Sequence, residues 1–187
     1  MSPDWSRTPG EGRYARSELE RRFLVDRPSP PGCDLRAIED RYLQDTRLRL
    51  RTVRAGAEVV HKLTQKVRAR PDDPSAVALT NTYLSAEEHA VLAVLPGDDL
   101  VKTRRVVPFE GLSWVVDVFG GRLSGLVLAE VEVADLHATL SLPRWVGREV
   151  SSEDAFSGGA LAATPLDDVA EVLAQPRRAD WSRRRGR

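Results

Sequence analysis

Acidic side chains recur at alternate positions in two short segments of the 187-residue chain. Glu18 and Glu20 form one pair, and Glu130 and Glu132 form another inside the apolar run from Leu126 to Val133. Carboxylates gathered on one face attract hard cations such as Mg²⁺, which prefers oxygen ligands. The two pairs therefore indicate a divalent-metal site, provided that the fold brings them together.

Basic side chains follow the same spacing elsewhere. Arg47, Arg49 and Arg51 alternate with leucines, and Lys62 and Lys66 share one parity of their own segment. Like charges side by side on a strand repel one another unless an anion or carboxylates lie between them. Arginine binds phosphate through paired hydrogen bonds, and lysine binds it as a point charge. A complex of Mg²⁺ with a polyphosphate would satisfy the acidic and the basic sets together.

Strands must position these residues, because a period of two places every second side chain on one face. An ordinary antiparallel sheet turns such a polar face to water, which is the simplest explanation for any single strand. Three faces that each repeat one sign favour another arrangement, in which the sheet closes into a barrel and the charges point into its lumen. Charges in such a lumen need partners or a ligand, because unpaired charges in a low dielectric are costly.

Few helices accompany the strands. The segment Ser85–Leu95 opens with Ser85 and Glu88 as a capping box, and the segment Thr164–Gln175 opens with Thr164 as N-cap and Pro165 in the first turn. A third helix is predicted after Asp135. Many strands without a βαβ rhythm predict an α+β protein built on an antiparallel sheet.

Composition excludes several classes of protein. The 28 basic and 28 acidic side chains cancel, which argues against a general nucleic-acid binder. Cys33 is the single cysteine, and no cysteine and histidine cluster has zinc spacing. No apolar run reaches the length of a membrane span or forms a signal segment, so we expect a cytoplasmic protein without a membrane partner.

The chain divides into one domain and two tails. We expect residues 1–13 to be disordered, residues 14–175 to form the domain with its C-terminal helix, and residues 176–187 to be a basic disordered tail. This tail holds six arginines against Asp180. Such a charge run is usually a solvated segment, and an electrostatic arm for RNA or polyphosphate is the alternative.

Several segments, taken in order, resemble the CYTH family of triphosphate tunnel metalloenzymes. Glu18–Val25 is similar to the family's N-terminal Glu-x-Glu-x-Lys signature with its apolar continuation. Lys62–Lys66 resembles the strand with the tunnel lysine, and Gly125–Glu132 resembles the strand with paired acids. The other matching segments are Tyr42–Leu43 with Leu48–Arg51, Lys102–Arg104, Trp114–Phe119 and Trp145–Val150. Together they cover about residues 15–163.

The resemblance implies an eight-stranded antiparallel β-barrel, the triphosphate tunnel, with flanking helices. It also implies a metal-dependent triphosphate hydrolase that uses Mg²⁺ or Mn²⁺, most specifically an inorganic triphosphatase (tripolyphosphatase), with an inorganic or organic triphosphate as substrate. The implied metal-side residues are Glu18, Glu20, Asp117, Glu130 and Glu132. The implied phosphate-binding residues are Arg22, Arg49, Arg51, Lys66 and Arg104, to which strand parity adds Lys62 and Lys102. The implied catalytic residues are Glu18, Glu20, Lys66 and Arg104.

The chain departs from the family pattern in places. Arg22 stands where the signature has lysine, the segment Thr80–Leu84 has no acid where many members carry several, and Val115 occupies a position that is often glutamate. Five acids suit one metal better than two. Two other functions stay open at this point, a class IV-type adenylate cyclase and a non-catalytic module that binds polyphosphate or phosphorylated RNA.

Overall fold

The computed structural model describes residues 8–11, 13–70 and 73–174. Within these ranges, nine strands form one antiparallel sheet, with three short α-helices and three 3₁₀ turns. The strands are β1 (Arg16–Val25), β2 (Cys33–Leu43), β3 (Leu48–Ala55), β4 (Glu58–Arg70), β5 (Asp73–Leu84), β6 (Gly97–Phe109), β7 (Leu112–Phe119), β8 (Val127–Glu132) and β9 (Val146–Glu149). The helices are α1 (Ala86–Leu92), α2 (Gly158–Ala163) and α3 (Val169–Ala174), and the 3₁₀ turns are η1 (Gly121–Leu123), η2 (Asp154–Phe156) and η3 (Leu166–Asp168).

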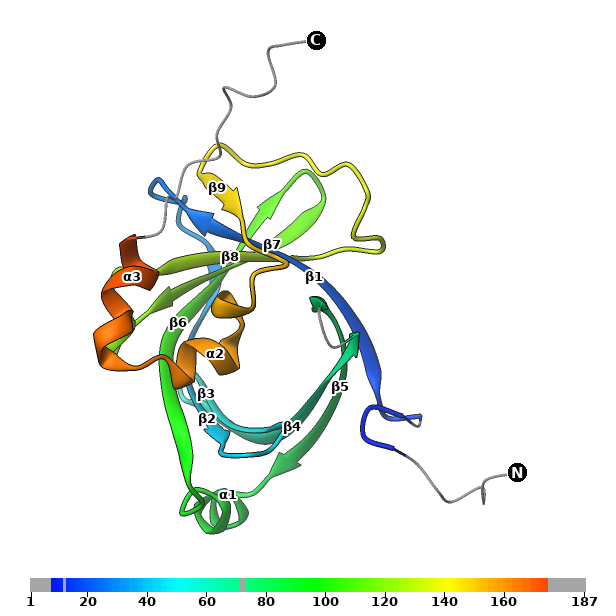
Figure 1. Cartoon of the computed structure of the whole chain (residues 1–187), viewed down its shortest axis with the longest axis vertical. Helices are drawn as coiled ribbons and strands as arrows, with labels where there is room; N and C mark the ends of the chain where they lie inside the picture. The colour runs from blue at the N-terminus through cyan, green and yellow to red at the C-terminus, as the bar shows by residue number, and fades with distance from the viewer. Residues whose placement is uncertain (1–7, 12, 71–72, 175–187) are drawn as a thin grey trace.

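The sheet closes on itself. Its order is β5-β4-β3-β2-β6-β7-β8-β1, and β1 pairs again with β5, so that eight strands make a barrel (Figure 1). Closure depends on the long strand β1, which pairs with β5 through residues 16–19 and with β8 through residues 20–24. Strand β9 pairs with β1 at Phe23 and Val25, which lie further along β1 than the residues that pair with β5. The predicted eight-stranded antiparallel barrel is confirmed.

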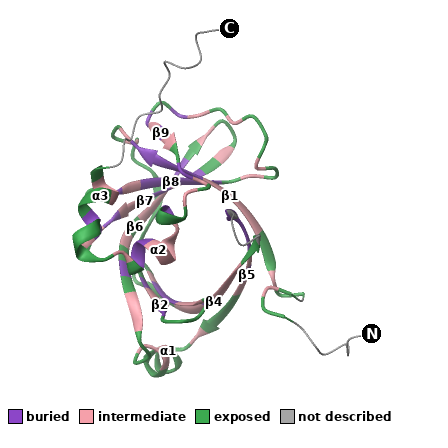
Figure 2. Ribbon diagram, viewed as in Figure 1, coloured by how far each residue is buried: buried purple, intermediate pink, exposed green. Residues whose placement is uncertain are grey.

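One hydrophobic core covers the outside of the barrel at β1, β7 and β8, where Figure 2 shows a concentration of buried residues. Phe23 and Trp114 are fully buried there, with ring centroids 5.5 Å apart. Trp145, just before β9, packs edge-on against Trp114 at 5.9 Å. Phe23 follows Arg22 on β1, and Trp114 has the parity opposite to Asp117 on β7, so burying the two aromatic side chains outward turns Arg22 and Asp117 into the lumen.

A second core closes one end of the lumen. The inward-facing positions of β1, β8 and β7 change from charged residues to Leu24, Leu128 and Phe119, all of them buried. These three side chains belong to one cluster with Phe156 of η2 and Leu161 of α2. Helix α2 lies within the ring of strands in Figure 1 and contacts β2 and β6. The charged part of the lumen therefore ends against an apolar plug.

The capped helix after Ser85 is confirmed, in a shorter form. Helix α1 has Ser85 as its N-cap, and the reciprocal hydrogen bonds with Glu88 complete the capping box. It ends at Leu92, before the predicted Leu95. None of the helices in the described part of the chain is long and apolar enough to cross a bilayer.

The C-terminal helical region differs from the prediction. Thr164 is the C-cap of α2 and not the N-cap of a following helix. Pro165 disfavours helical backbone at the residue before it, and the chain resumes with η3 and α3. Helix α2 itself was not predicted, because the pair Gly158 and Gly159 at its start has a poor helix propensity.

The helix predicted after Asp135 is wrong, because that segment forms turns. The side chain of Asp135 accepts a hydrogen bond from the backbone N–H of His137, which is a local alternative to a helical turn.

The predictions of disorder at residues 1–7 and of a disordered basic tail at 176–187 fall outside the described residues. Residues 8–11 form a turn in which the N–H of Glu11 donates to the carbonyl of Thr8.

Candidate active site in the barrel lumen

Strand register places the predicted site residues on the inner face. Residues paired across an antiparallel ladder lie on the same face of the sheet. Glu20 is paired with Glu132 and Arg22 with Glu130, and Arg104 is paired with Asp117. On the opposite side of the barrel, Arg51 is paired with Lys62 and Arg49 with Thr64. The parity that was predicted within each motif is thus continuous around the barrel.

The acidic wall of the lumen comes from β1 and β8. Arg22 donates from its Nε to Glu130 at 2.7 Å, and its Nη2 lies 3.5 Å from Glu20. Arg104 donates to the other oxygen of Glu130 at 3.1 Å. The charge of Glu130, and then burial, raise the pKa of Glu20 above its ordinary value. Burial also opposes ionisation of Glu130, but Arg22 and Arg104 hold its pKa well below the ordinary value.

Asp117 on β7 ties the acidic wall to β6. Its two oxygens accept hydrogen bonds from Arg104, each at 2.7 Å, and one also accepts from Lys102 at 2.6 Å. Burial disfavours the charge of Asp117, but the two cations lower its pKa below the ordinary value. Both oxygens of Asp117 already accept hydrogen bonds, as do both oxygens of Glu130, so either carboxylate would bind a metal only by sharing or exchanging these partners.

The basic wall comes from β2 and β3 and contains an acid that the sequence analysis missed. Arg51 forms a two-armed ion pair with Asp40, at 2.5 and 2.6 Å, and Asp40 is fully buried. The Nε of Arg49 lies 3.6 Å from Asp40 and has no hydrogen-bond partner in the described chain. Asp40 is the carboxylate that the repeated arginines required. The available signal was its parity with Tyr42 along β2, opposite Arg51 and Arg49.

The remaining predicted residues are more open to solvent. Lys66 lies 3.9 Å from Glu20 and is half-buried, as is Glu18. Glu132 shares the face of Glu20, but its side chain is 57% exposed and paired with exposed Arg16 at 2.9 Å. Arg47 precedes β3 and is exposed, although its carbonyl accepts a hydrogen bond from the backbone N–H of Lys66.

A polar link crosses β3, β4 and β5 where the family pattern has acids. Arg49 donates to the hydroxyl of Thr64 at 3.4 Å, and Thr64 donates to the side-chain oxygen of Asn81 at 2.7 Å. An amide therefore occupies the lumen where the segment Thr80–Leu84 lacks an acid. This replacement leaves the basic wall with fewer negative charges to balance its arginines.

The half-buried side chain of Tyr42 links the basic wall to the plug. Its ring centroid lies 6.0 Å from the guanidinium carbon of Arg49, and burial raises the pKa of the phenol. A Cβ placed on Gly158 of α2 would stand 2.0 Å from the hydroxyl oxygen of Tyr42. Glycine at position 158 is thus required by the close approach of α2 to β2.

This contact gives a testable prediction about the plug. Gly158→Ala should lower the free energy of unfolding by about 1–3 kcal/mol, the usual effect of overpacking, because the new methyl group displaces Tyr42. Gly159→Ala is the matched control, since its Cβ would meet Tyr42 at an ordinary 3.6 Å. Urea denaturation of both variants measures the difference. Equal effects from the two substitutions would contradict the contact.

The lumen as a whole carries an excess of positive charge. Seven basic residues face five acidic ones around the site, when three exposed ion pairs (Arg16 with Glu132, Arg36 with Asp34, and Arg68 with Asp154) and Asp98, at the level of Tyr42, are left aside. The acids are Glu18, Glu20, Asp40, Asp117 and Glu130, and the bases are Arg22, Arg49, Arg51, Lys62, Lys66, Lys102 and Arg104. Such a lumen favours an anionic ligand with several charges.

The donor set fits a hard divalent cation in kind and in charge. The raised pKa of Glu20, caused first by Glu130, shows local negative charge that a cation would relieve. Glu20 and Glu130 are the central candidates, with Glu18 and Glu132 on the same face. Among the residues that the structure describes, no three carboxylate, imidazole or thiol groups are already gathered closely enough to hold an ion. The carboxylates would therefore have to converge on a bound metal.

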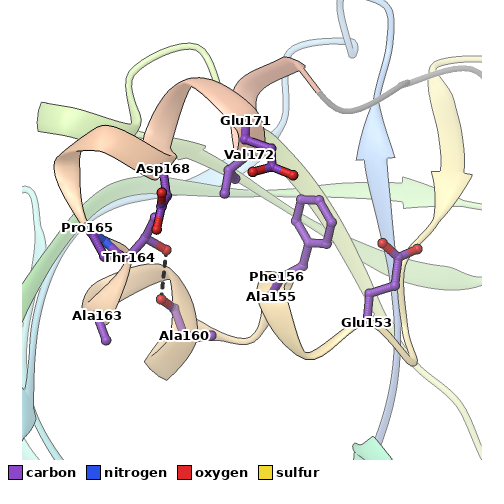
Figure 3. Close-up of a pocket in the computed structure, with 10 residues that line it drawn as sticks. All are labelled: Glu153, Ala155, Phe156, Ala160, Ala163, Thr164, Pro165, Asp168, Glu171 and Val172. Carbon is purple, nitrogen blue, oxygen red and sulfur yellow. Dashed lines mark hydrogen bonds between the residues drawn. The ribbon is translucent and has the colours of Figure 1, made fainter.

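A separate pocket of about 420 Å³ lies outside the lumen, beside α2 and α3 (Figure 3). Phe156, Ala160 and Val172 are among its apolar lining residues, and Glu153 and Glu171 are among its acidic ones. Carboxylates at the rim repel a polyanion, so this pocket does not suit a triphosphate. The lumen is the better candidate for the active site.

Comparisons with known proteins agree with this assignment. No family model matches the chain. A segment of 70 residues is 39% identical to an inorganic triphosphatase from Acetivibrio thermocellus, and it covers 37% of this chain and 45% of that protein. The match thus spans less than half the length of that relative.

Solved structures extend the similarity over most of the chain. The structure of the inorganic triphosphatase NE1496 superposes with a TM-score of 0.57 at 25% identity, covering 79% of this chain and 95% of that one. A second structure of NE1496, described as a hypothetical protein, gives the same TM-score and identity and is covered over 98% of its length. Fold, motifs and relatives together confirm the resemblance of this chain to the CYTH family of triphosphate tunnel proteins.

Proposed function

We propose that this protein is a metal-dependent triphosphate hydrolase, and specifically an inorganic triphosphatase. The observation that carries the proposal is the lumen, which joins a wall of excess cations to a wall of carboxylates inside one closed barrel. A triphosphate carries several negative charges along its length. Its oxygens can therefore contact the cations of the basic wall while its metal ion contacts the carboxylates of the acidic wall. The similarity to two inorganic triphosphatases supports the same substrate class.

The chain's own residues would bind and orient the substrate. Arg49, Arg51 and Lys62 would hold phosphate oxygens at the basic wall, and Lys66 and Arg104 would hold those nearest the acids. Arg22 and Lys102 complete the predicted phosphate-binding set. Arg104 already links Asp117 to Glu130, so it can exchange a carboxylate partner for a phosphate oxygen without leaving the site. The apolar plug at α2 excludes water from one end of the lumen.

Glu18, Glu20, Glu130 and Glu132 would hold Mg²⁺ or Mn²⁺, with Asp117 as a further contributor. When bound, such an ion polarises a phosphoryl oxygen and lowers the pKa of a coordinated water. Glu18 and Glu20 would position the metal, and Lys66 and Arg104 would neutralise the charge on the transferred phosphoryl group. Both kinds of residue are therefore proposed as catalytic.

A panel of substrates tests the proposal. Purified protein is incubated with tripolyphosphate, ATP or thiamine triphosphate, each with Mg²⁺ or Mn²⁺, and phosphate release and cyclic AMP are measured in parallel. We expect metal-dependent phosphate release, fastest with tripolyphosphate. Cyclic AMP formed from ATP would identify a cyclase instead. Binding of tripolyphosphate without release or cyclisation would identify a non-catalytic module.

A further inference from the structure

Lys62 faces the lumen in surroundings that differ from those of the other luminal lysines. It lies on β4, opposite Arg51 on β3 and opposite Tyr83 on β5. The charged groups that face it are Arg49 and Arg51 from β3, Asp40 from β2 and Arg104 from β6. Three of these four groups are cations, and β5 contributes a phenol and no acid at this level.

Lys62 lacks the carboxylate contact that the other luminal lysines have. Lys102 contacts Asp117 at 2.6 Å, and Lys66 lies 3.9 Å from Glu20. In the part of the chain that the structure describes, no carboxylate oxygen lies within ion-pair distance of the Lys62 amine. Asp40, the acid whose charge acts on Lys62, is already held through both oxygens in its pair with Arg51.

These surroundings disfavour the charged ammonium form of Lys62 relative to the neutral amine. Burial first, and then the charges of Arg51 and Arg49, lower the pKa of Lys62 to about 8. A bound polyanion has the opposite effect on the pKa of Lys62, because its negative charge favours the protonated amine. The pKa of Lys62 should then rise toward the ordinary lysine value of about 10.4.

We propose that Lys62 is a phosphate-binding residue that takes up a proton when a triphosphate enters the lumen. The inference rests on the proposed function, because it needs a triphosphate at the basic wall. Its consequence is a coupling between substrate affinity and pH above neutrality. Near pH 8 about half of the free protein carries a neutral Lys62 amine, and near pH 9 about nine-tenths does, so binding draws a correspondingly larger fraction of a proton from solution.

Calorimetric titration with tripolyphosphate measures this proton directly. The titration is run in EDTA, which prevents metal-dependent turnover, and in two buffers that differ in ionisation enthalpy. The matched variant is Lys62→Arg, which keeps the positive charge and holds its proton throughout this pH range. The phosphate oxygens also exchange protons with the buffer, so the informative quantity is the difference between wild type and variant.

At pH 8 we expect wild type to take up about half a proton more than Lys62→Arg, and at pH 6.5 we expect no difference. Above pH 8 the wild-type dissociation constant should rise by up to about tenfold per pH unit relative to the variant. Lys62→Met is the second variant, and it should bind weakly with no excess proton uptake at either pH. Thermal unfolding checks that both variants fold.

Two failures can be told apart. Equal proton uptake by wild type and Lys62→Arg at pH 8, with tight binding by both, would overturn the role of Lys62 alone. Absence of binding by wild type would overturn the claim that the luminal cations hold a triphosphate, and the inference about Lys62 with it. The phosphate-release panel tests turnover independently of either result.

Discussion

Replacing Glu20 with glutamine should lower the turnover of tripolyphosphate by at least about a hundredfold while leaving the fold at least as stable. Loss of a residue that merely supports a metal ligand already costs about 10–100-fold in many metal sites, and Glu20 is proposed as a direct ligand. The stability should not fall, because the charge of Glu130 raises the pKa of Glu20 and the ionised pair is repulsive. Glutamine keeps the shape and removes that repulsion. Initial rates of phosphate release and thermal unfolding measure the two effects.

Glu39→Gln is the matched control for this experiment. Glu39 follows the outer parity of β2, next to Asp40, and its side chain is 59% exposed. Its removal should leave turnover within about twofold of wild type, because it touches neither wall of the lumen. Raising the Mg²⁺ concentration should partly restore Glu20→Gln and do little for Lys66→Ala, whose ammonium is expected to meet the substrate. A Glu20→Gln enzyme with nearly normal turnover would remove Glu20 from the metal site.

Replacing Asp40 with alanine should lower the free energy of unfolding by about 3–5 kcal/mol, the usual cost of removing one partner of a buried ion pair. Arg51 would lose its two-armed partner, and Arg49 would lose its nearest carboxylate, at 3.6 Å. Both guanidinium groups would then remain charged in a lumen that already holds excess positive charge. Urea denaturation measures the loss, and Glu39→Ala on the opposite face of β2 should change stability by less than about 1 kcal/mol.

The same residue gives the fold a defined sensitivity to acid. Burial by itself would raise the pKa of Asp40, but hydrogen bonds from Arg51 and the charge of Arg49 hold it below the ordinary value. A carboxyl with a lowered pKa in the folded state contributes stability above its unfolded value of about 3.9, and this stability is lost as the pH falls below that value. The stability difference between wild type and Asp40→Ala should therefore shrink as the pH is lowered below about 4. A difference that stays constant to acid pH would contradict the ion pair.

Strand parity explains why much of this site was predictable. Side-chain alternation depends only on neighbouring residues, so the inward position of Glu20, Arg22 and Glu130 could be inferred within each strand. Closure of the barrel followed from the repetition of one sign on several faces, because only a shared lumen gives those charges partners.

Pairing between distant strands could not be inferred in the same way. Asp40 lies in a segment where acids and bases alternate irregularly, and its role appears only when β2 and β3 set it opposite Arg51. Glu132 follows the luminal parity but stands at the end of β8, where its side chain reaches solvent and Arg16. Strand ends and cross-strand partners depend on register, which the printed sequence does not specify.

The six-residue helix α2 was also beyond the sequence analysis. Helix α2 begins with two glycines, and its existence depends on packing against Phe156 and the lumen and not on intrinsic propensity. Gly158 has a steric role, since the absence of a side chain makes room for Tyr42.

The most direct test of the whole account is the rate of phosphate release from tripolyphosphate by wild-type protein, measured as Mg²⁺ is added back to protein treated with EDTA. We predict no release without the metal and a saturable rise as it is restored, because the luminal cations can bind the anion by themselves but hydrolysis needs a metal ion at the acidic wall. Tight binding of tripolyphosphate without metal, together with no phosphate release at any Mg²⁺ or Mn²⁺ concentration, would contradict the account. The lumen would then be a site that binds a triphosphate without hydrolysing it.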